Sequence, residues 1–215
     1  MNSENAKPAT PVQHIVSTPT LRVRDQFVSY QGTGCLAGKR QDFVRLAGCN
    51  VRCPLRANCD QPEALGSKGD DKTIANIVGE MKTDWLHITG GEPAEHEHMV
   101  ALCDAATEAG KWVQVQTSGT IPIKWNYMPF VSVSPKGQKI ENVRTSEIVL
   151  VASKWMTNLR ALQVTDGFDC PVFVIPEATA GNFESGDMFE LLEVLAAAGR
   201  DARAGLQSHL VWGVA

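Results

Sequence analysis

The chain has 215 residues, of which 43% are hydrophobic, with a formal net charge of −4 at pH 7 and a pI of about 5.7. This composition suffices for one domain with a substantial core, and the negative charge argues against a general nucleic-acid or anionic-membrane binder. No apolar run reaches the roughly 20 residues of a membrane span. Because no basic segment precedes an apolar stretch at the N-terminus, we expect no signal peptide.

The N-terminal part predicts an arm, a strand and a glycine turn. Residues 1–20 are mostly small and polar with little periodicity, so we expect a disordered arm in front of a single domain over residues 21–215. Leu21–Tyr30 alternates as a strand does. The turn Gln31–Gly34 either lets backbone approach a ligand closely or simply closes a hairpin.

Three cysteines then follow a short apolar strand, Phe43–Ala47, in one loop. Cys49, Cys53 and Cys59 are soft ligands at short spacing, as an iron–sulfur cluster or a zinc ion requires. A set of three leaves one metal position without a protein ligand, where chemistry can occur. Free structural thiols are the alternative, and Cys35 is a candidate substitute for one of the three ligands. Clustered cysteines in a core-rich chain also predict a cytoplasmic protein.

The rest of the chain alternates strands with helices. An apolar stripe over Ile74–Met81 predicts a helix capped by Asp70 or Asp71, and Met99–Ala106 predicts a second one closed by Gly110. Met188–Leu195 predicts a third, and Trp155–Leu162 a short one. The remaining expected strands are Trp85–Thr89, Trp112–Thr117, Phe130–Ser134, Glu147–Ala152 and Val172–Ile175.

Six strands with about three firm helices predict an α/β fold with a mainly parallel sheet, a truncated TIM-type (β6/α3-like) barrel. The chain is too short for eight full units at the usual ~250 residues. Reactive groups in such barrels lie after the C-terminal ends of the strands. The landmarks that follow strands here are Cys49, Gly90-Gly91-Glu92, Ser118, Ser134-Pro135-Lys136 and Pro176-Glu177. We therefore expect one site at this rim.

These motifs, in their order, resemble the 7-carboxy-7-deazaguanine synthase family of the radical SAM superfamily. The matching segments span roughly Gln26 to the C-terminus, and they are specific as an ordered set rather than singly. They are Tyr30–Gly34, Phe43–Asn50, Cys59-Asp60, Thr89–Pro93, Gln116–Thr120 and Ser132–Lys136.

The resemblance implies a radical SAM barrel with a [4Fe–4S] cluster on Cys49, Cys53 and Cys59, and with S-adenosylmethionine (SAM) at the open iron. It implies SAM-binding positions at Gly90, Gly91, Glu92, Ser118, Ser134, Pro135, Lys136 and Pro176. It implies substrate contacts at Tyr30, Gln31, Gly32, Arg45, Thr89 and His209, and Gln61 as a candidate Mg²⁺ ligand. Three alternatives stay open. Glu92 orients the SAM amine or holds its turn, Arg45 binds a substrate carboxylate or an acidic side chain, and His209, on a segment similar to the family's C-terminal strand, lines the site or lies on the surface.

This chain departs from the family pattern at four places. The cysteine spacing is Cys-x3-Cys-x5-Cys rather than Cys-x3-Cys-x2-Cys, and Thr33 stands where the family usually has Glu. Gln61 replaces a threonine that resembles the family's magnesium ligand, and Ile175-Pro176 replaces Gln-Pro. These positions are where we expect contacts to differ.

The implied activity is that of a carbon–nitrogen lyase in 7-deazapurine (queuosine precursor) biosynthesis. The substrate would be 6-carboxy-5,6,7,8-tetrahydropterin, the product 7-carboxy-7-deazaguanine with release of ammonia, and SAM would be regenerated. The resemblance also implies a homodimer and an electron donor such as a flavodoxin. The alternatives are another small radical SAM enzyme (an activase or peptide modifier), a non-catalytic zinc-binding module, and a family member that no longer turns over.

Overall fold

One mostly parallel sheet organises the chain. The computed structural model describes residues 18–137, 139–141, 144–179, 182–184 and 188–214. The strands are β1 (Thr20–Tyr30), β2 (Arg40–Leu46), β3 (Asp70–Thr73), β4 (Trp85–Gly90), β5 (Trp112–Thr117), β6 (Phe130–Val133), β7 (Glu147–Ala152), β8 (Val172–Thr179), β9 (Asn182–Glu184) and β10 (Ala202–Ala204). The helices are α1 (Ile74–Gly79), α2 (Met99–Glu108), α3 (Asn158–Thr165), α4 (Met188–Ala197) and α5 (Ser208–Trp212).

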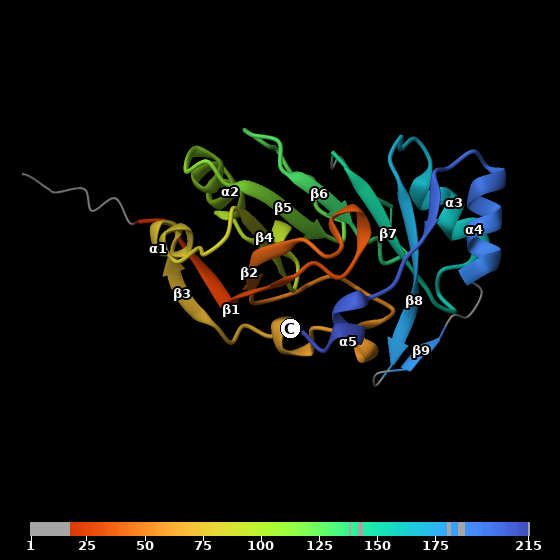
Figure 1. Ribbon diagram of the computed structural model, residues 1–215, viewed down its shortest axis with the longest axis horizontal. Coiled ribbons are helices and arrows are strands. Elements are labelled where there is room, and N and C mark those ends of the chain that lie inside the picture. Colours follow the sequence, from red (N-terminus) through yellow and green to blue (C-terminus); the bar gives the residue numbers. More distant parts are fainter. Residues whose placement is uncertain (1–17, 138, 142–143, 180–181, 185–187, 215) are drawn as a thin grey trace, which may run out of the picture.

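The strand order confirms the expected partial barrel. It runs β10-β8-β7-β6-β5-β4-β2-β1-β3, and β9 pairs with β8. All pairs from β10 to β2 are parallel, whereas β1, β3 and β9 pair antiparallel with their neighbours. All six predicted barrel strands are present in this parallel part. Helices α1 and α2 pack at one end of the sheet, and α3 and α4 at the other (Figure 1).

Some local predictions were wrong because pairing and capping override sequence pattern. Asp70 and Asp71 do not cap α1, since they pair with β1 as part of β3. Thr73 is the cap, and its Oγ1 accepts from the Asn76 amide at 3.2 Å. The cap of α3 is Thr157, so this helix begins three residues later than predicted. The segment around His209, expected as a strand, forms α5, and β10 was not predicted.

The arm predicted for residues 1–20 lies outside the described residues except for its last three, and Thr20 is already the first residue of β1. The longest described helices, α2 and α4, have ten residues each. None of the described helices combines the length and apolar character needed to cross a bilayer.

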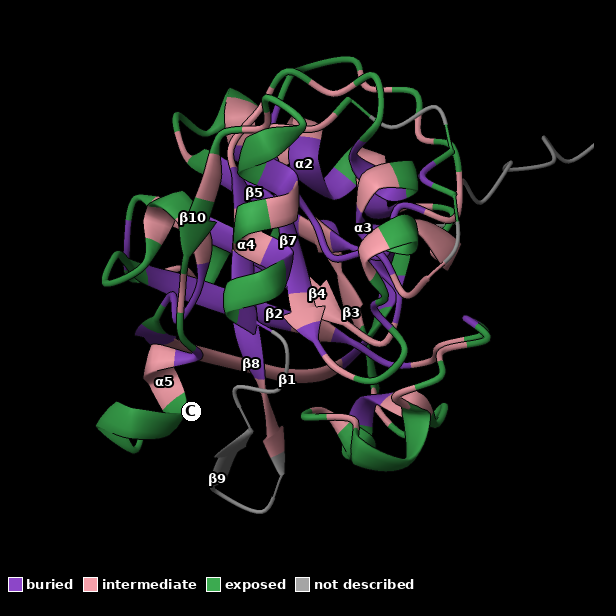
Figure 2. Ribbon diagram, turned by 90° about the vertical axis from the view of Figure 1, so that its right-hand side faces the viewer, coloured by how far each residue is buried: buried purple, intermediate pink, exposed green. Residues whose placement is uncertain are grey.

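The sheet has an apolar outer face and a polar inner face. The outer face packs on the helices through strand residues such as Leu86 and Ile148, with Leu191 of α4 in the same core as Ile148, so that the central strands lie buried behind α4 (Figure 2). The inner face carries polar side chains that are fully buried: Gln41, His87, Gln114, Ser132 and Glu147. A polar interior of this kind supports a ligand site at the end of the strands rather than a plain core.

Replacing His87 with glutamine should change how stability depends on pH. The ring is fully buried and stacks on Phe43 with centroids 4.5 Å apart, and burial lowers the pKa of His87 to about 3. The unfolded chain takes up a proton near pH 6.5, so this contribution is present above that pH and is lost as the pH falls toward 3. Wild type should therefore lose about 2 kcal/mol of unfolding free energy between pH 7.5 and pH 5 through this group.

Urea unfolding at the two pH values measures the effect. His87→Gln should remove the His87 part of the loss, whereas His98→Gln, at the partly exposed N-cap of α2, should keep it. If the unfolding free energy falls by the same amount between the two pH values in His87→Gln and in wild type, His87 is not a neutral buried group.

Candidate active site

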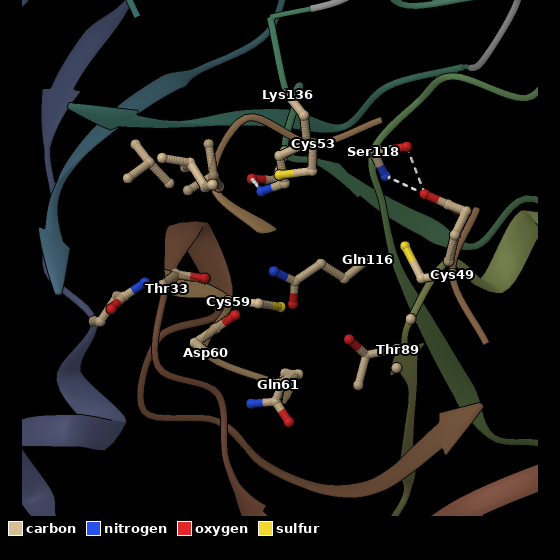
Figure 3. Close-up of a pocket in the computed structure, with 18 of the residues that line it drawn as sticks. Thr33, Cys49, Cys53, Cys59, Asp60, Gln61, Thr89, Gln116, Ser118 and Lys136 are labelled. Atoms are coloured by element: carbon tan, nitrogen blue, oxygen red, sulfur yellow. Dashed lines mark hydrogen bonds between the residues drawn. The ribbon is translucent and has the colours of Figure 1, made fainter. Parts of the chain in front are cut away.

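A single pocket at the C-terminal ends of the parallel strands gathers the predicted site residues (Figure 3). It is walled by β2, β4, β5, β7 and β8, by the cysteine loop and by the segment leading into α5. All but two of the predicted residues line it, namely Tyr30, Gln31, Gly32, Arg45, Cys49, Cys53, Cys59, Gln61, Thr89, Gly90, Gly91, Glu92, Ser118, Ser134, Lys136 and His209. The two exceptions are prolines: Pro135 borders a smaller neighbouring hollow, and Pro176 lies within β8 rather than after it.

The cysteine loop presents three free, half-buried thiols to this pocket. Burial raises the pKa of Cys49 and Cys59, so ligation would displace their protons. The donor set, three thiols and no further cysteine in the lining, fits a cluster with one open iron. Within the described ranges, no three His, Cys, Asp or Glu side chains converge as ligands of one metal ion.

The residues inserted between Cys53 and Cys59 carry the loop across the pocket. Asn58 Nδ2 lies 3.4 Å from a Glu177 oxygen of β8, and Arg56 donates to the Cys49 carbonyl at 3.3 Å. At the start of the loop, the Asn50 amide donates to Glu95 at 2.6 Å. The longer cysteine spacing thus brings Asn58 to β8, while the start of the loop is held separately by Glu95.

Close backbone packing requires the two glycines at the end of β4, Gly90 and Gly91. Gly90 has φ +129°, and a Cβ there would overlap the backbone of Leu46. A Cβ on Gly91 would overlap the Gly48 carbonyl, which accepts from the Glu92 amide at 3.0 Å. The turn is thereby fixed directly against the start of the cysteine loop.

The Glu92 carboxylate, only 1% exposed, is fully engaged by protein donors. Its Oε1 accepts from Thr117 Oγ1 at 2.5 Å and from the Ala94 amide at 3.1 Å. Its Oε2 accepts from the amide and the hydroxyl of Ser118, at 2.8 and 2.5 Å. Both oxygens therefore hold the end of β5 to the glycine turn, which supports the second of the two roles considered for Glu92.

Replacing Glu92 with glutamine should destabilise the fold by about 2–4 kcal/mol. The amide nitrogen would face donors, and a buried charge-assisted network would lose two or more hydrogen bonds. Chemical denaturation measures the change, with the exposed Glu97→Gln as the control that stays within about 0.5 kcal/mol of wild type. Unchanged stability together with weaker SAM binding would instead assign Glu92 to direct contact with the cofactor.

Arg45 brings an unpaired cation to the pocket from β2, where it is in register with Thr89 of β4. It is half-buried on β2, with its guanidinium carbon 4.6 Å from the Phe27 ring centroid. Its Nε is buried without a hydrogen-bond partner, and no acidic side chain of the described residues forms an ion pair with it. Burial lowers the pKa of Arg45, although the carboxylates of Asp25, Asp60 and Glu63 act in the opposite direction.

Several polar groups accompany Arg45 on this side. Thr89 and Gln116 follow on β4 and β5, with Asp60 and Gln61 across from them (Figure 3). The His209 ring packs against Gly32, and burial lowers the pKa of His209. Of the two alternatives for His209, its place in the pocket lining supports the one in which it lines the site.

Some lining residues were not among the predicted site residues. Phe43, Gln116 and Val149 were missed although each lies in a predicted strand. The alternation of side chains along a strand is the signal that could have placed them on the inner face. Asp60 and Glu177 adjoin recognised motifs. Gln207 carried no signal, since its position depends on α5 folding back on the pocket.

The comparisons with known proteins agree on one family. No family profile matches the chain. It is 35% identical over 124 residues to the 7-carboxy-7-deazaguanine synthase of Aquifex aeolicus, which covers 54% of this chain and 55% of that protein. It is 38% identical over 128 residues to the synthase of Halobacterium salinarum, which covers 55% and 46%. The chain thus spans about half the length of these relatives.

Two further matches extend over more of the chain. The crystal structure of QueE from Escherichia coli covers 87% of this chain and 93% of its own, with a TM-score of 0.63 and 21% identity, a likeness of fold. The 7-carboxy-7-deazaguanine synthase of Bacteroides thetaiotaomicron is 34% identical over 131 residues, 60% of this chain and 69% of that protein. On this extent of matched sequence, the chain belongs to the 7-carboxy-7-deazaguanine synthase family.

Proposed function

We propose that this chain is a radical SAM lyase that converts 6-carboxy-5,6,7,8-tetrahydropterin to 7-carboxy-7-deazaguanine with release of ammonia. The observation that carries the proposal is the pocket itself. Three cysteine thiols of one loop, the glycine turn and the unpaired Arg45 of β2 meet there, in a chain of this family.

Cys49, Cys53 and Cys59 would hold a [4Fe–4S] cluster, and SAM would complete the open iron. When bound, this pair supplies a carbon-centred radical that can take a hydrogen atom from a substrate. The chain's own part is to bind and to shield. Lys136, whose Nζ lies 2.8 Å from Ser134 Oγ, would offer donors to the ribose or carboxylate of SAM, whereas the Ser118 hydroxyl, whose proton goes to Glu92, would only accept.

The other wall would bind the pterin. A carboxylate is the ligand that best completes the half-buried guanidinium of Arg45, because it can accept two parallel hydrogen bonds. Thr89, Gln31 and His209 would offer hydrogen bonds to the polar edges of the ring, and the flat ring of Phe43 lies among them. Bringing the two ligands into one cavity away from bulk water is the main contribution of such a site to catalysis.

Magnesium, partners and location belong to the same proposal. The amide oxygen of Gln61 lies in the lining beside Asp60 and would serve as a hard ligand for Mg²⁺. All six cysteines are unpaired, which supports a reducing cytoplasm. We propose a homodimer reduced by a flavodoxin-like donor, and the exposed Leu210, Val211 and Trp212 of α5 support a protein contact.

Anaerobic reconstitution tests the proposal. The protein with its iron–sulfur cluster reconstituted is incubated with reductant, SAM, Mg²⁺ and 6-carboxy-5,6,7,8-tetrahydropterin, and the products are identified by mass spectrometry. We expect 7-carboxy-7-deazaguanine. 5′-Deoxyadenosine without the deazaguanine would favour another small radical SAM enzyme, and zinc without iron or sulfide in the isolated protein would favour the zinc-binding module.

A further inference from the structure

The substrate wall of the pocket includes a turn whose first part, residues 31–33, has no regular structure and whose end begins a short 3-10 helix, Gly34–Leu36. Gln31, Gly32 and Thr33 line the pocket between β1 and β2 and are buried. Two glycines in four residues make this backbone intrinsically flexible. Since ligand contacts need a fixed backbone, the turn must be held by its surroundings.

The first half of the turn is held by Gln31 and by the segment leading into α5. Gln31 Oε1 accepts from the amides of Gly32 and Thr33, at 2.7 and 3.4 Å. Its Nε2 lies 3.3 Å from Nδ1 of the buried His87. The Gly32 carbonyl accepts from the Ser208 amide at 2.9 Å.

The second half is held by Glu147, the fully buried first residue of β7. Glu147 Oε2 accepts from the Cys35 amide at 2.6 Å. Both carboxylate oxygens lie directly against Gly34, where φ is +71° and a Cβ would overlap them. Neither an ion pair nor a partner for Oε1 is found for Glu147 within the described residues.

Packing alone does not account for a carboxylate here. Burying a carboxylate is costly, and an apolar side chain would fill the same inner position of β7 more cheaply. What the carboxylate adds is a strong acceptor at the end of the turn, where it takes the Cys35 amide and also interacts with the Cys35 thiol. Its action is therefore on the shape of the pocket wall.

We propose that Glu147 is a positioning residue that fixes the Gly32–Cys35 turn and thereby the substrate side of the pocket. Glu92 holds the cofactor side through Ser118, so two separate buried carboxylates position the two halves. That one side of the pocket binds the substrate and the other the cofactor rests on the proposed function. That Glu147 holds the turn does not depend on it.

Amide hydrogen exchange, measured on the protein without ligands, tests whether Glu147 holds the turn in place. In Glu147→Ala the Cys35 amide should exchange at least about tenfold faster, while the Ser118 amide should keep its wild-type rate. Glu147→Gln, whose amide oxygen can still accept, should stay close to wild type at Cys35. Glu147→Asp, a shorter carboxylate, should behave as Glu147→Ala, and it carries the test if the alanine variant fails to fold.

Steady-state turnover tests whether the turn in its fixed position is needed for binding of the pterin. Glu147→Ala or Glu147→Asp should raise KM for the pterin about tenfold or more and leave KM for SAM within twofold. Unchanged exchange at Cys35, or equal acceleration at Cys35 and Ser118, would overturn the positioning role. Equal changes in both KM values would overturn the separation of the halves. If wild type makes no deazaguanine, the proposed function fails, and the exchange result still decides the role of Glu147.

Discussion

Cys53→Ala is expected to lose the iron–sulfur cluster and all measurable turnover. Only two thiols, Cys49 and Cys59, would remain in the pocket, too few to hold a cluster against solvent. Loss of an outer-sphere partner of a metal ligand typically costs about 10–100-fold in affinity or activity, so loss of a ligand should exceed 100-fold. Iron and sulfide content, the visible absorption of the cluster and 5′-deoxyadenosine formation measure the effect.

Cys170→Ala is the matched control, because this thiol packs against the hydrophobic core and lies outside the pocket lining. It should keep the iron content and activity of wild type. A Cys53→Ala protein that retains a full cluster would assign another residue to the third ligand position, and Cys35 would then be the next cysteine to replace.

Arg45→Ala is expected to raise KM for the carboxylated pterin by about 30–200-fold, since one charge-assisted pair in a half-buried site contributes about 2–3 kcal/mol. Arg45→Lys keeps the charge but loses the planar two-pronged donor, so it should recover only part of the loss. Steady-state kinetics with varied pterin at saturating SAM measure both variants.

Arg22→Lys is the control, because Arg22 pairs with Asp71 on the exposed β1–β3 edge and should leave the kinetics unchanged. A further comparison uses the substrate. With a tetrahydropterin that lacks the carboxylate, wild type and Arg45→Ala should bind about equally weakly. A KM for the carboxylated pterin that is unaffected by Arg45→Ala would show that Arg45 does not bind the substrate carboxylate.

The strands of the fold were largely legible in the sequence. Trp112–Thr117 and Glu147–Ala152 have the bounds of β5 and β7, because the first alternates apolar and polar residues and the second is a continuous apolar run after Glu147, as in a strand buried on both faces. β3 was not legible, since Asp70–Thr73 is polar and becomes a strand only by pairing with the start of β1. Local pattern carries no information about such a partner.

The site was legible where it consists of contiguous motifs. The cysteine loop and the turn after β4 could be placed at one rim from their positions after strands. The buried carboxylates that hold these segments in place could not be recognised from the sequence. Glu147 has no sequence signal beyond its place at the head of a strand, and its contact with Cys35 joins residues 112 positions apart. The three donors that Thr117 and Ser118 direct at Glu92 likewise come together only when β5 lies beside the glycine turn.

The most direct test of the account is a turnover measurement with SAM limiting and pterin in excess, in which 7-carboxy-7-deazaguanine and ammonia are counted together. The account predicts equal amounts of the two, exceeding the SAM supplied and absent in Cys53→Ala. A fully loaded cluster that cleaves SAM but yields neither deazaguanine nor ammonia from this pterin would contradict it.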